Sequence, residues 1–262
     1  EIAAGYSSFC ARRTDDGTVW CWGDCNYGQC GDGSYKVSRN DVRKSRPVQV
    51  TGITGAVSVA HGSNHVCALL ADGTARCWGL NNFAQLGVGN AEGTRIYNGG
   101  GAVHAQPQTV TVVDSIVELA LGNGVSCARR DDGTVWCWGS GSLGMLGSEI
   151  NGSYRAAAAQ VPDLPANATQ LVSNHTSFCT QHADWSLRCW GNNSHNQLGT
   201  GGVGVQIGPV QPSARFTELL IGRLGQTSGR GYALTRTGRF VRWGSDWYGR
   251  GYVADPIIIP FP

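Results

Sequence analysis

One phrase recurs five times along the chain, and this repetition limits the possible folds more than any other feature. It reads "CARRTDDGTVWCWG" at residues 10–23, and related versions begin at 67 ("CALLADGTARCWG"), 127 ("CARRDDGTVWCWG"), 179 ("CTQHADWSLRCWG") and 232 ("YALTRTGRFVRWG"). The Trp-Gly pairs that begin at 22, 78, 138, 190 and 243 are 52 to 60 residues apart. Repeats of this period are typical of propellers and solenoids, in which each unit needs its neighbours to bury a core.

The composition predicts β-strands and indicates neither a nucleic acid nor a membrane as the partner. The chain has 39 glycines among 262 residues, and Thr, Val, Trp and Tyr occur in short stretches between turn signals. No segment approaches the roughly 18 uninterrupted apolar residues of a membrane-spanning helix. A net charge of +2 does not by itself indicate a nucleic-acid or membrane surface. The numbering begins at Glu1 without a charged and apolar leader, so we expect any secretion signal to have been removed.

The cysteines of the repeated phrase are placed to form disulfides. Cys67 and Cys77 are symmetric about Asp72, so a hairpin with loop 71–73 puts them opposite each other, with Gly73 in the left-handed position. Opposed strand residues lie about 4.5–5.5 Å apart at Cα, which a disulfide can span. The same reasoning, with one extra loop residue in the first pair, gives the bridges Cys10–Cys21, Cys127–Cys137 and Cys179–Cys189. Cys25 with Cys30 is most simply a fifth bridge that closes a tight loop.

Metal binding is the alternative use of these cysteines. The short Cys-to-Cys spacing of zinc sites is missing from four of the five pairs, and only Cys21, Cys25 and Cys30 are dense enough to suggest a metal. We therefore predict five disulfides and no metal site. Disulfides persist in oxidising compartments, so we expect a secreted, extracellular or cell-surface protein, with the periplasm as a further location.

Each full unit reads as a proline-led strand, a second strand, the cysteine hairpin, Trp-Gly, a "QLG"-like phrase and a variable loop. Three or four short strands per unit fit one propeller blade. We predict one all-β domain over 1–262, a five-bladed β-propeller with hairpin cores near 5–31, 60–87, 121–147, 173–199 and 227–252. The first unit lacks the proline-led strand that residues 47–53 supply to the second. We therefore expect the closing strand 256–261, through Ile257–Ile259, to pair into the first blade and close the ring.

At this level the sequence resembles the regulator of chromosome condensation repeat family. The match is carried by "VAHGSNHVCALLADGTARCWGLNNFAQLGVG", with "WGDCNYGQCG" at 22–31, "WGSGSLGMLG" at 138–147 and "WGNNSHNQLG" at 190–199. The family includes nuclear exchange factors that act on a small GTPase and secreted bacterial inhibitors of β-lactamase. The cysteines and the near-neutral charge favour the secreted, protein-binding branch. Two features depart from the family: its well-known rings have seven blades, and the fifth unit here reads "YGRGY" at 248–252 in place of "GQLG".

The recurring side chains are predicted to be structural. Recurrence within a repeat indicates packing, so the Trp of each Trp-Gly pair is expected to pack between blades. His65 falls at a position where the family repeat carries a His, which favours a structural hydrogen bond. The aspartates of the hairpins suit turn geometry rather than acid catalysis. The six scattered histidines form no catalytic or metal constellation, so we predict no catalytic residues and no cofactor.

The variable loops are the candidate binding surface. They occupy one point of the repeat and should emerge on one rim of the ring, and Tyr and Arg are enriched in interface hot spots. Trp185 replaces a hairpin glycine, and Trp247 lies in the divergent last unit. The candidate contact residues are Tyr35, Lys36, Arg39, Arg95, Tyr97, Tyr154, Arg155, Trp185, Trp247 and Tyr248. The alternative is that these loops are solvated and tolerate any polar sequence.

Four Asn-x-Ser/Thr sequences would accept glycans in a secreted eukaryotic protein and would mean little in a bacterial one. They begin at Asn151, Asn167, Asn174 and Asn192.

These observations predict a binding protein rather than an enzyme. The loop rim would engage a macromolecular partner, most simply a protein, with no nucleic acid and no membrane insertion. Two alternatives stay open: a subunit of an extracellular self-assembled structure, and a lectin with one sugar pocket per blade. An enzyme ranks last.

Overall fold

The computed structural model describes residues 1–96, 100–149, 153–184, 186–212, 219–220, 230–235, 240–245 and 252–258. Within these ranges the chain is all-β, and its one helical segment is a single 3-10 turn, η2 (Ser142–Gly144). None of this part of the chain forms a helix of the length and apolarity needed to cross a membrane.

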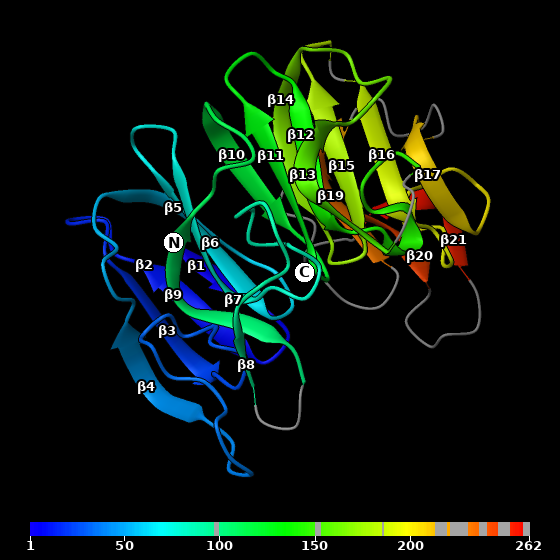
Figure 1. Ribbon diagram of the computed structural model, residues 1–262. Coiled ribbons are helices and arrows are strands. Elements are labelled where there is room, and N and C mark those ends of the chain that lie inside the picture. Colours follow the sequence, from blue (N-terminus) through cyan, green and yellow to red (C-terminus); the bar gives the residue numbers. More distant parts are fainter. Residues whose placement is uncertain are drawn as a thin grey trace. The chain divides into compact units, whose positions relative to one another are not determined.

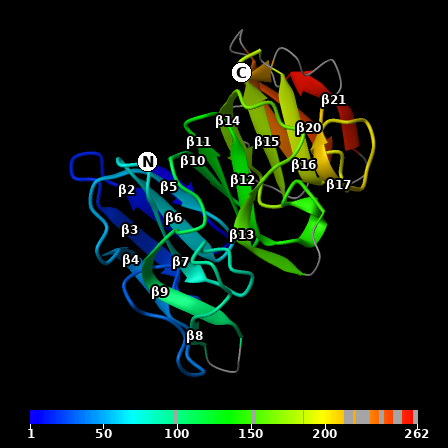
Figure 2. The same cartoon turned by 45° about the horizontal axis from the view of Figure 1, so that its top comes forward.

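The strands form five antiparallel sheets, four with four strands and one with five (Figure 1). The first sheet contains β1 (Ile2–Ala4), β2 (Ser8–Arg12), β3 (Val19–Asp24) and β4 (Arg43–Gln49). The second contains β5 (Ala56–His61), β6 (His65–Leu70), β7 (Ala75–Leu80), β9 (Ala102–Thr109) and β8 (Thr94–Arg95), in that spatial order. The third contains β10 (Ile116–Leu121), β11 (Val125–Arg130), β12 (Val135–Ser140) and β13 (Tyr154–Gln160) (Figure 2). The fourth contains β14 (Ala168–Ser173), β15 (Ser177–His182), β16 (Leu187–Asn192) and β17 (Val205–Val210), and the fifth β18 (Leu219–Leu220), β19 (Arg230–Thr235), β20 (Phe240–Ser245) and β21 (Tyr252–Ile258).

The chain separates into two compact units. The first unit is residues 1–131, 136–141 and 150–159, and holds the first two sheets and most of the third. The second unit is residues 132–135, 142–149 and 160–262, and holds the fourth and fifth sheets.

The proline-led strands end their own sheets, which corrects the expected ring closure. Residues 47–49 lie in β4, where Val48 is opposite Cys21 and Gln49 opposite Trp20, so the first sheet already has its fourth strand. In the fifth sheet Ile257 pairs with Arg242 of β20 and not with the first sheet. Ile258 likewise pairs within the fifth sheet, and Ile259 lies outside the described residues. The reason is that each such strand follows the third strand of its sheet through one loop, and closing that loop costs less chain entropy than a pairing across the whole chain.

The cysteine hairpins form as the sequence predicts. Cys67 lies opposite Cys77 and Cys179 opposite Cys189. All four hairpin bridges have a Cα–Cα distance of 4.1 Å. Cys25 and Cys30 form the fifth disulfide, and no cysteine is free. The alternative of a metal bound by Cys21, Cys25 and Cys30 is thereby removed.

The hairpin aspartates stabilise their turns. Asp72 Oδ1 accepts hydrogen bonds from the backbone N–H of Thr74 at 2.9 Å and from its hydroxyl at 2.6 Å, and Asp132 does the same for Thr134. The hydrogen bonds from the Thr74 hydroxyl and N–H lower the pKa of Asp72. The prediction that these carboxylates shape turns is confirmed.

The Trp of each Trp-Gly pair binds the "QLG"-like phrase of the preceding repeat. Trp78, Trp138, Trp190 and Trp243 are buried, and each indole N–H donates to a backbone carbonyl. The acceptors are Gln29 O at 3.0 Å, Gln85 O at 3.0 Å, Met145 O at 2.9 Å and Gln197 O at 2.7 Å. The contacts of Trp78 and Trp138 join successive sheets of the first unit, and that of Trp243 joins successive sheets of the second unit, as the repeat predicts.

Trp22 is an exception to the expectation that all five are core residues. It is only partly buried and stacks on Phe9, with ring centroids 5.8 Å apart.

The glycine after Trp22, Trp78, Trp138 and Trp190 is required by a close backbone approach. Gly79 has a φ of +104°, and a Cβ there would lie 2.5 Å from Asn64 O. We expect Gly79→Ala to cost about 3 kcal/mol or more in the free energy of unfolding, because left-handed strain and a backbone clash add. The matched control is Gly52→Ala. Gly52 has a φ of +69°, but no atom lies within 4 Å of the place where a Cβ would be, so this change should cost about 1–2 kcal/mol. Equal losses in a urea titration would show that the close approach does not matter.

Buried histidines connect neighbouring sheets through serines. His65 Nε2 lies 3.0 Å from Ser126 Oγ, and that hydroxyl donates to Gln85 O at 2.7 Å. His61 Nε2 lies 3.0 Å from Ser8 Oγ. The predicted structural hydrogen bond of His65 is confirmed.

His182 in the fourth sheet should make the protein less stable in acid. Burial, followed by the charge of Arg188, lowers its pKa in the folded state. The unfolded chain takes up a proton near pH 6.5, so below that pH it binds more protons than the folded chain. Stability is therefore full above about pH 6.5 and falls as the pH drops below it. Between neutral and mildly acidic pH, the urea midpoint of His182→Gln should decline less than that of the wild type. Part of the decline should remain in the variant, because burial also lowers the pKa of His175. Identical pH profiles would contradict this.

Candidate functional site

Antiparallel order places the loops of a sheet at two opposite ends. The turns after the first and third strands lie at one end, and the cysteine hairpin and the connection to the next sheet lie at the other. In the first unit, the first end carries loops 25–42 and 81–101, and we call it the loop face. The other end carries hairpin turns such as 71–74, and we call it the hairpin face.

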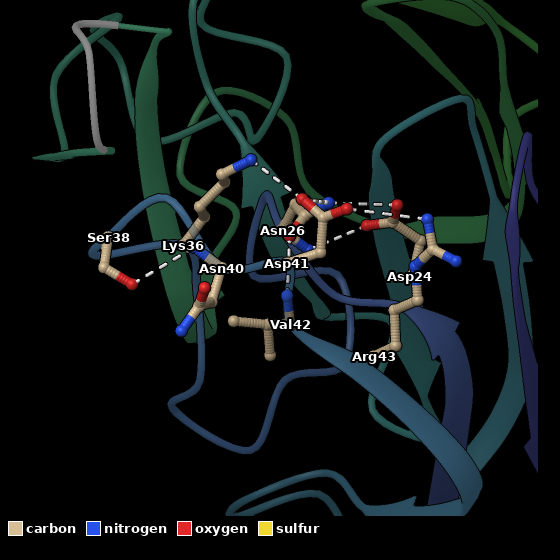
Figure 3. A network of polar contacts seen from close by, with 8 residues as sticks. All are labelled: Asp24, Asn26, Lys36, Ser38, Asn40, Asp41, Val42 and Arg43. Carbon is tan, nitrogen blue, oxygen red and sulfur yellow. Dashed lines mark hydrogen bonds and ion pairs between the residues drawn. The ribbon is translucent and has the colours of Figure 1, made fainter.

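The first loop of the loop face is pinned by a polar network centred on Asp41 (Figure 3). Lys36 Nζ donates to Asp41 Oδ1 at 2.8 Å, and Arg43 lies 3.5 Å from the other oxygen. Asn26 Nδ2 donates to the same carboxylate at 3.4 Å, and Asn26 Oδ1 accepts from the N–H of Val42 at 2.8 Å. With the Cys25–Cys30 disulfide at its start, this loop is ordered before any partner arrives.

The positive charge of Lys36 is paired with the carboxylate of Asp41 within this network. The hydrogen bond and the charge of Lys36 lower the pKa of Asp41, which therefore stays ionised. Lys44 makes a similar pair with Asp32 at 2.8 Å. Lys36 thus helps to order the loop, and its contact with a partner stays a prediction.

The second loop is organised by a buried asparagine that sequence reasoning missed. Asn81 Nδ2 donates to Asn90 O at 3.0 Å and to Glu92 O at 2.6 Å, and Asn81 Oδ1 accepts from the N–H of Leu86 at 3.2 Å. In the second unit Asn193 makes the equivalent bonds to Thr200, Gly202 and Leu198. The signal was present in the sequence, because both asparagines lie three residues after the Trp of their repeat.

A pocket of about 620 Å³ opens on the loop face beside this loop. Arg95 of β8 and Tyr154 of β13 both line it, together with Asn82, Glu92 and Ala156. Arg95 is exposed, and Tyr154 keeps 41% of its surface accessible. The pocket therefore presents a cation, a carboxylate, an amide and an aromatic ring around one opening.

The structure brings together only some of the predicted contact residues. Arg95 and Tyr154 share the pocket. Tyr35 and Lys36 lie on the other loop and are half-buried, and Arg39 on the same loop is exposed. Arg155 is half-buried, and burial lowers its pKa.

The remaining candidates cannot be placed. Those outside the described residues are Tyr97, Trp185, Trp247 and Tyr248, and, among the glycan sites, Asn151. Asn167 is exposed, and Asn174 and Asn192 are half-buried. Their glycosylation remains a prediction.

The hairpin face holds a second hollow, of about 540 Å³, that sequence reasoning also missed. Trp136 and Arg130 line it, with the guanidinium 5.9 Å from the centroid of the indole. Asp114 holds Arg130 through an ion pair of 2.8 Å. No group of three or more His, Cys, Asp or Glu in the described ranges could hold a metal ion.

The sequence matches known repeat families over several segments. The family described as "Regulator of chromosome condensation (RCC1) repeat" matches residues 16–69, and a second family of the same description matches residues 1–29, 56–85 and 116–144. The human E3 ubiquitin-protein ligase HERC2 is 28% identical over 217 residues, which is 80% of this chain and 4% of HERC2. The Protein RCC2 homolog of Xenopus laevis is 31% identical over 167 residues, which is 62% of this chain and 30% of that protein. The chain thus spans only a minor part of these relatives.

Solved structures share the fold. Human WBSCR16 is 20% identical with a TM-score of 0.80, covering 100% of this chain and 67% of WBSCR16. Yeast RCC1 (Prp20), solved with Kap60 bound, is 20% identical with a TM-score of 0.76, covering 99% of this chain and 63% of that one. The family matches identify regulator of chromosome condensation (RCC1) repeats within residues 1–85 and 116–144, and the solved structures show that the chain has the fold of such repeats.

Proposed function

We propose that this chain is a non-catalytic binding protein that works outside the cell and engages a protein partner through its loop face. Its five sheets would be the blades of one propeller, as the sequence predicts. The observation that carries the proposal is the 620 Å³ pocket in which Arg95 and Tyr154 meet on ordered strands and loops.

The chemistry of this face suits protein recognition. Tyr and Arg are the residue types that interface hot spots use most, and side chains held in advance lose little entropy on binding. The loops are held by the Cys25–Cys30 bridge, by the Asp41 network and by Asn81. Yeast RCC1, which shares the fold, was solved with the protein Kap60 bound.

The extracellular location is supported by the five disulfides. Bridges of this number persist in oxidising compartments and are rare where thiols are kept reduced. All ten cysteines are buried, which protects the bridges from reductants.

A capture experiment tests the proposal. The oxidised protein is immobilised, exposed to the extracellular fraction of its source, and washed with and without competing free sugars. Retention of one protein that sugars do not displace supports the proposal. Retention that sugars abolish would make the chain a lectin, and retention of the same chain would make it a self-assembling subunit; either result overturns the proposal.

A further inference from the structure

The outer strands of four sheets carry a proline at one equivalent position. Val48, Gln108, Val210 and Ile257 each pair with the residue at the second-cysteine position of their sheet. The residue just before each of them is a proline: Pro47, Pro107, Pro209 and Pro256.

This proline lies where the backbone N–H would face away from the sheet. In the first sheet the N–H of Val50 donates to Val19 O at 2.8 Å, and Val42 O accepts from Cys25 at 2.8 Å, so both face inward. The register of β4 shifts between Lys44 and Val48, but Val48 pairs with Cys21 and lies in the regular stretch with Val50. Because directions alternate along that stretch, we infer that position 47, directly before Val48, faces the open edge. A proline there removes a donor that another strand could use, which is a common way to protect an edge.

The third sheet lacks this protection. The N–H of Val161 donates to Val135 O at 2.8 Å, as Val50 and Val110 donate in the first two sheets. The residue three positions earlier is proline in those sheets and Ala158 in β13. By this equivalence Ala158 has an N–H at the position where the first two sheets have proline, and that N–H is inferred to face the open edge. Ala158 is one of four consecutive alanines, residues 156–159, so only methyl groups flank it.

The outer edge of β13 is also uncovered. In the second sheet β8 adds to the outer strand β9, with Thr94 opposite Val103, so the chain itself shows strand addition at this kind of edge (Figure 1). β13 is the last strand of its sheet, and in the described ranges no strand pairs with its outer edge.

We propose that the outer edge of β13 binds an extended peptide segment of the partner protein by strand addition. Main-chain hydrogen bonds would provide the affinity, and the adjacent pocket, which Tyr154 and Ala156 line, would take a polar side chain beside Arg95 and Glu92. A second copy of β13 fits less well, because its alanines would leave the pocket empty. This inference rests on the proposed function, since it names the form in which the partner binds there.

The test uses a pool of phage-displayed random peptides, selected on the oxidised full chain. Selected peptides should bind Ala158→Pro at least about tenfold more weakly than the wild type, because one main-chain hydrogen bond is lost and the approaching strand meets the ring. Ala158→Ser, which keeps the N–H, is the matched control and should bind like the wild type. Bound peptide should also slow hydrogen exchange at the amides of residues 156 and 158 in the wild type, a readout independent of whether the proline variant folds.

The outcomes separate this inference from the proposed function. Peptides that lose affinity for Arg95→Ala but bind Ala158→Pro normally, without protecting the two amides, would leave the loop face in place and overturn strand addition. Failure to recover any peptide also overturns it. A dimer in solution that Ala158→Pro dissociates would assign the edge to a second copy of this chain.

Discussion

Replacing Trp138 with Ala should destabilise the protein by about 3–5 kcal/mol, the range for removing a fully buried aromatic side chain. Trp138 is fully buried between the second and third sheets, and its indole N–H donates to Gln85 O at 3.0 Å. The variant loses this packing and leaves a buried carbonyl without its indole donor. The free energy of unfolding from a urea titration measures the effect, with the disulfides kept oxidised.

Trp22→Ala is the matched control for this experiment. The same residue of the same repeated phrase is removed, but Trp22 is partly exposed and its described ring contact is the stacking on Phe9. Its loss should cost about 1–2 kcal/mol, from partial burial and one aromatic pair. If the two variants lost equal stability, the contact between each Trp and the preceding repeat would not be what holds the sheets together.

Removing the Cys127–Cys137 bridge by the double change to Ala should cost about 2–3 kcal/mol. The two residues are 10 positions apart, and cross-linking a loop of that size restricts the unfolded chain by about this amount. Both side chains are fully buried, so the lost sulfur packing acts in the same direction. Thermal unfolding with and without reductant measures it.

Reductant is the internal control for the bridge. It should lower the melting temperature of the wild type more than that of the double variant, since the variant has one bridge fewer to lose. A double variant as stable as the oxidised wild type would mean that the hairpin is held by its strand pairing and its Asp132 turn alone.

The sequence predicted features that depend on local geometry. The symmetry of Cys67 and Cys77 about Asp72 fixes the hairpin, its register and its bridge, and Gly73 takes the expected left-handed conformation with a φ of +80°. Local strand and turn rules are sufficient there, because no distant residue competes for these positions.

Features that depend on the choice of a partner were harder to predict. The repeat fixes the spacing of the proline-led strands, but it does not show whether each strand begins one unit or ends the unit before. The pairing of Val48 with Cys21 shows that the proline-led strand ends the sheet before it. The pocket was missed because Arg95 and Tyr154 are 59 positions apart and meet only when two sheets pack. The ion pair of Lys36 with Asp41 was also not predicted, because it forms only in the folded loop.

The most direct test of the binding account compares the two faces of the first unit with the captured partner. Arg95→Ala/Tyr154→Ala removes an Arg and an aromatic residue from the loop face, and Arg130→Ala/Trp136→Ala removes the same pair of types from the hairpin face. With folding checked by thermal unfolding, the loop-face variant should bind at least about a hundredfold more weakly, since two hot-spot residues typically carry 2 kcal/mol or more. The hairpin-face variant should bind as the wild type does. The reverse result, or equal losses, would contradict the account.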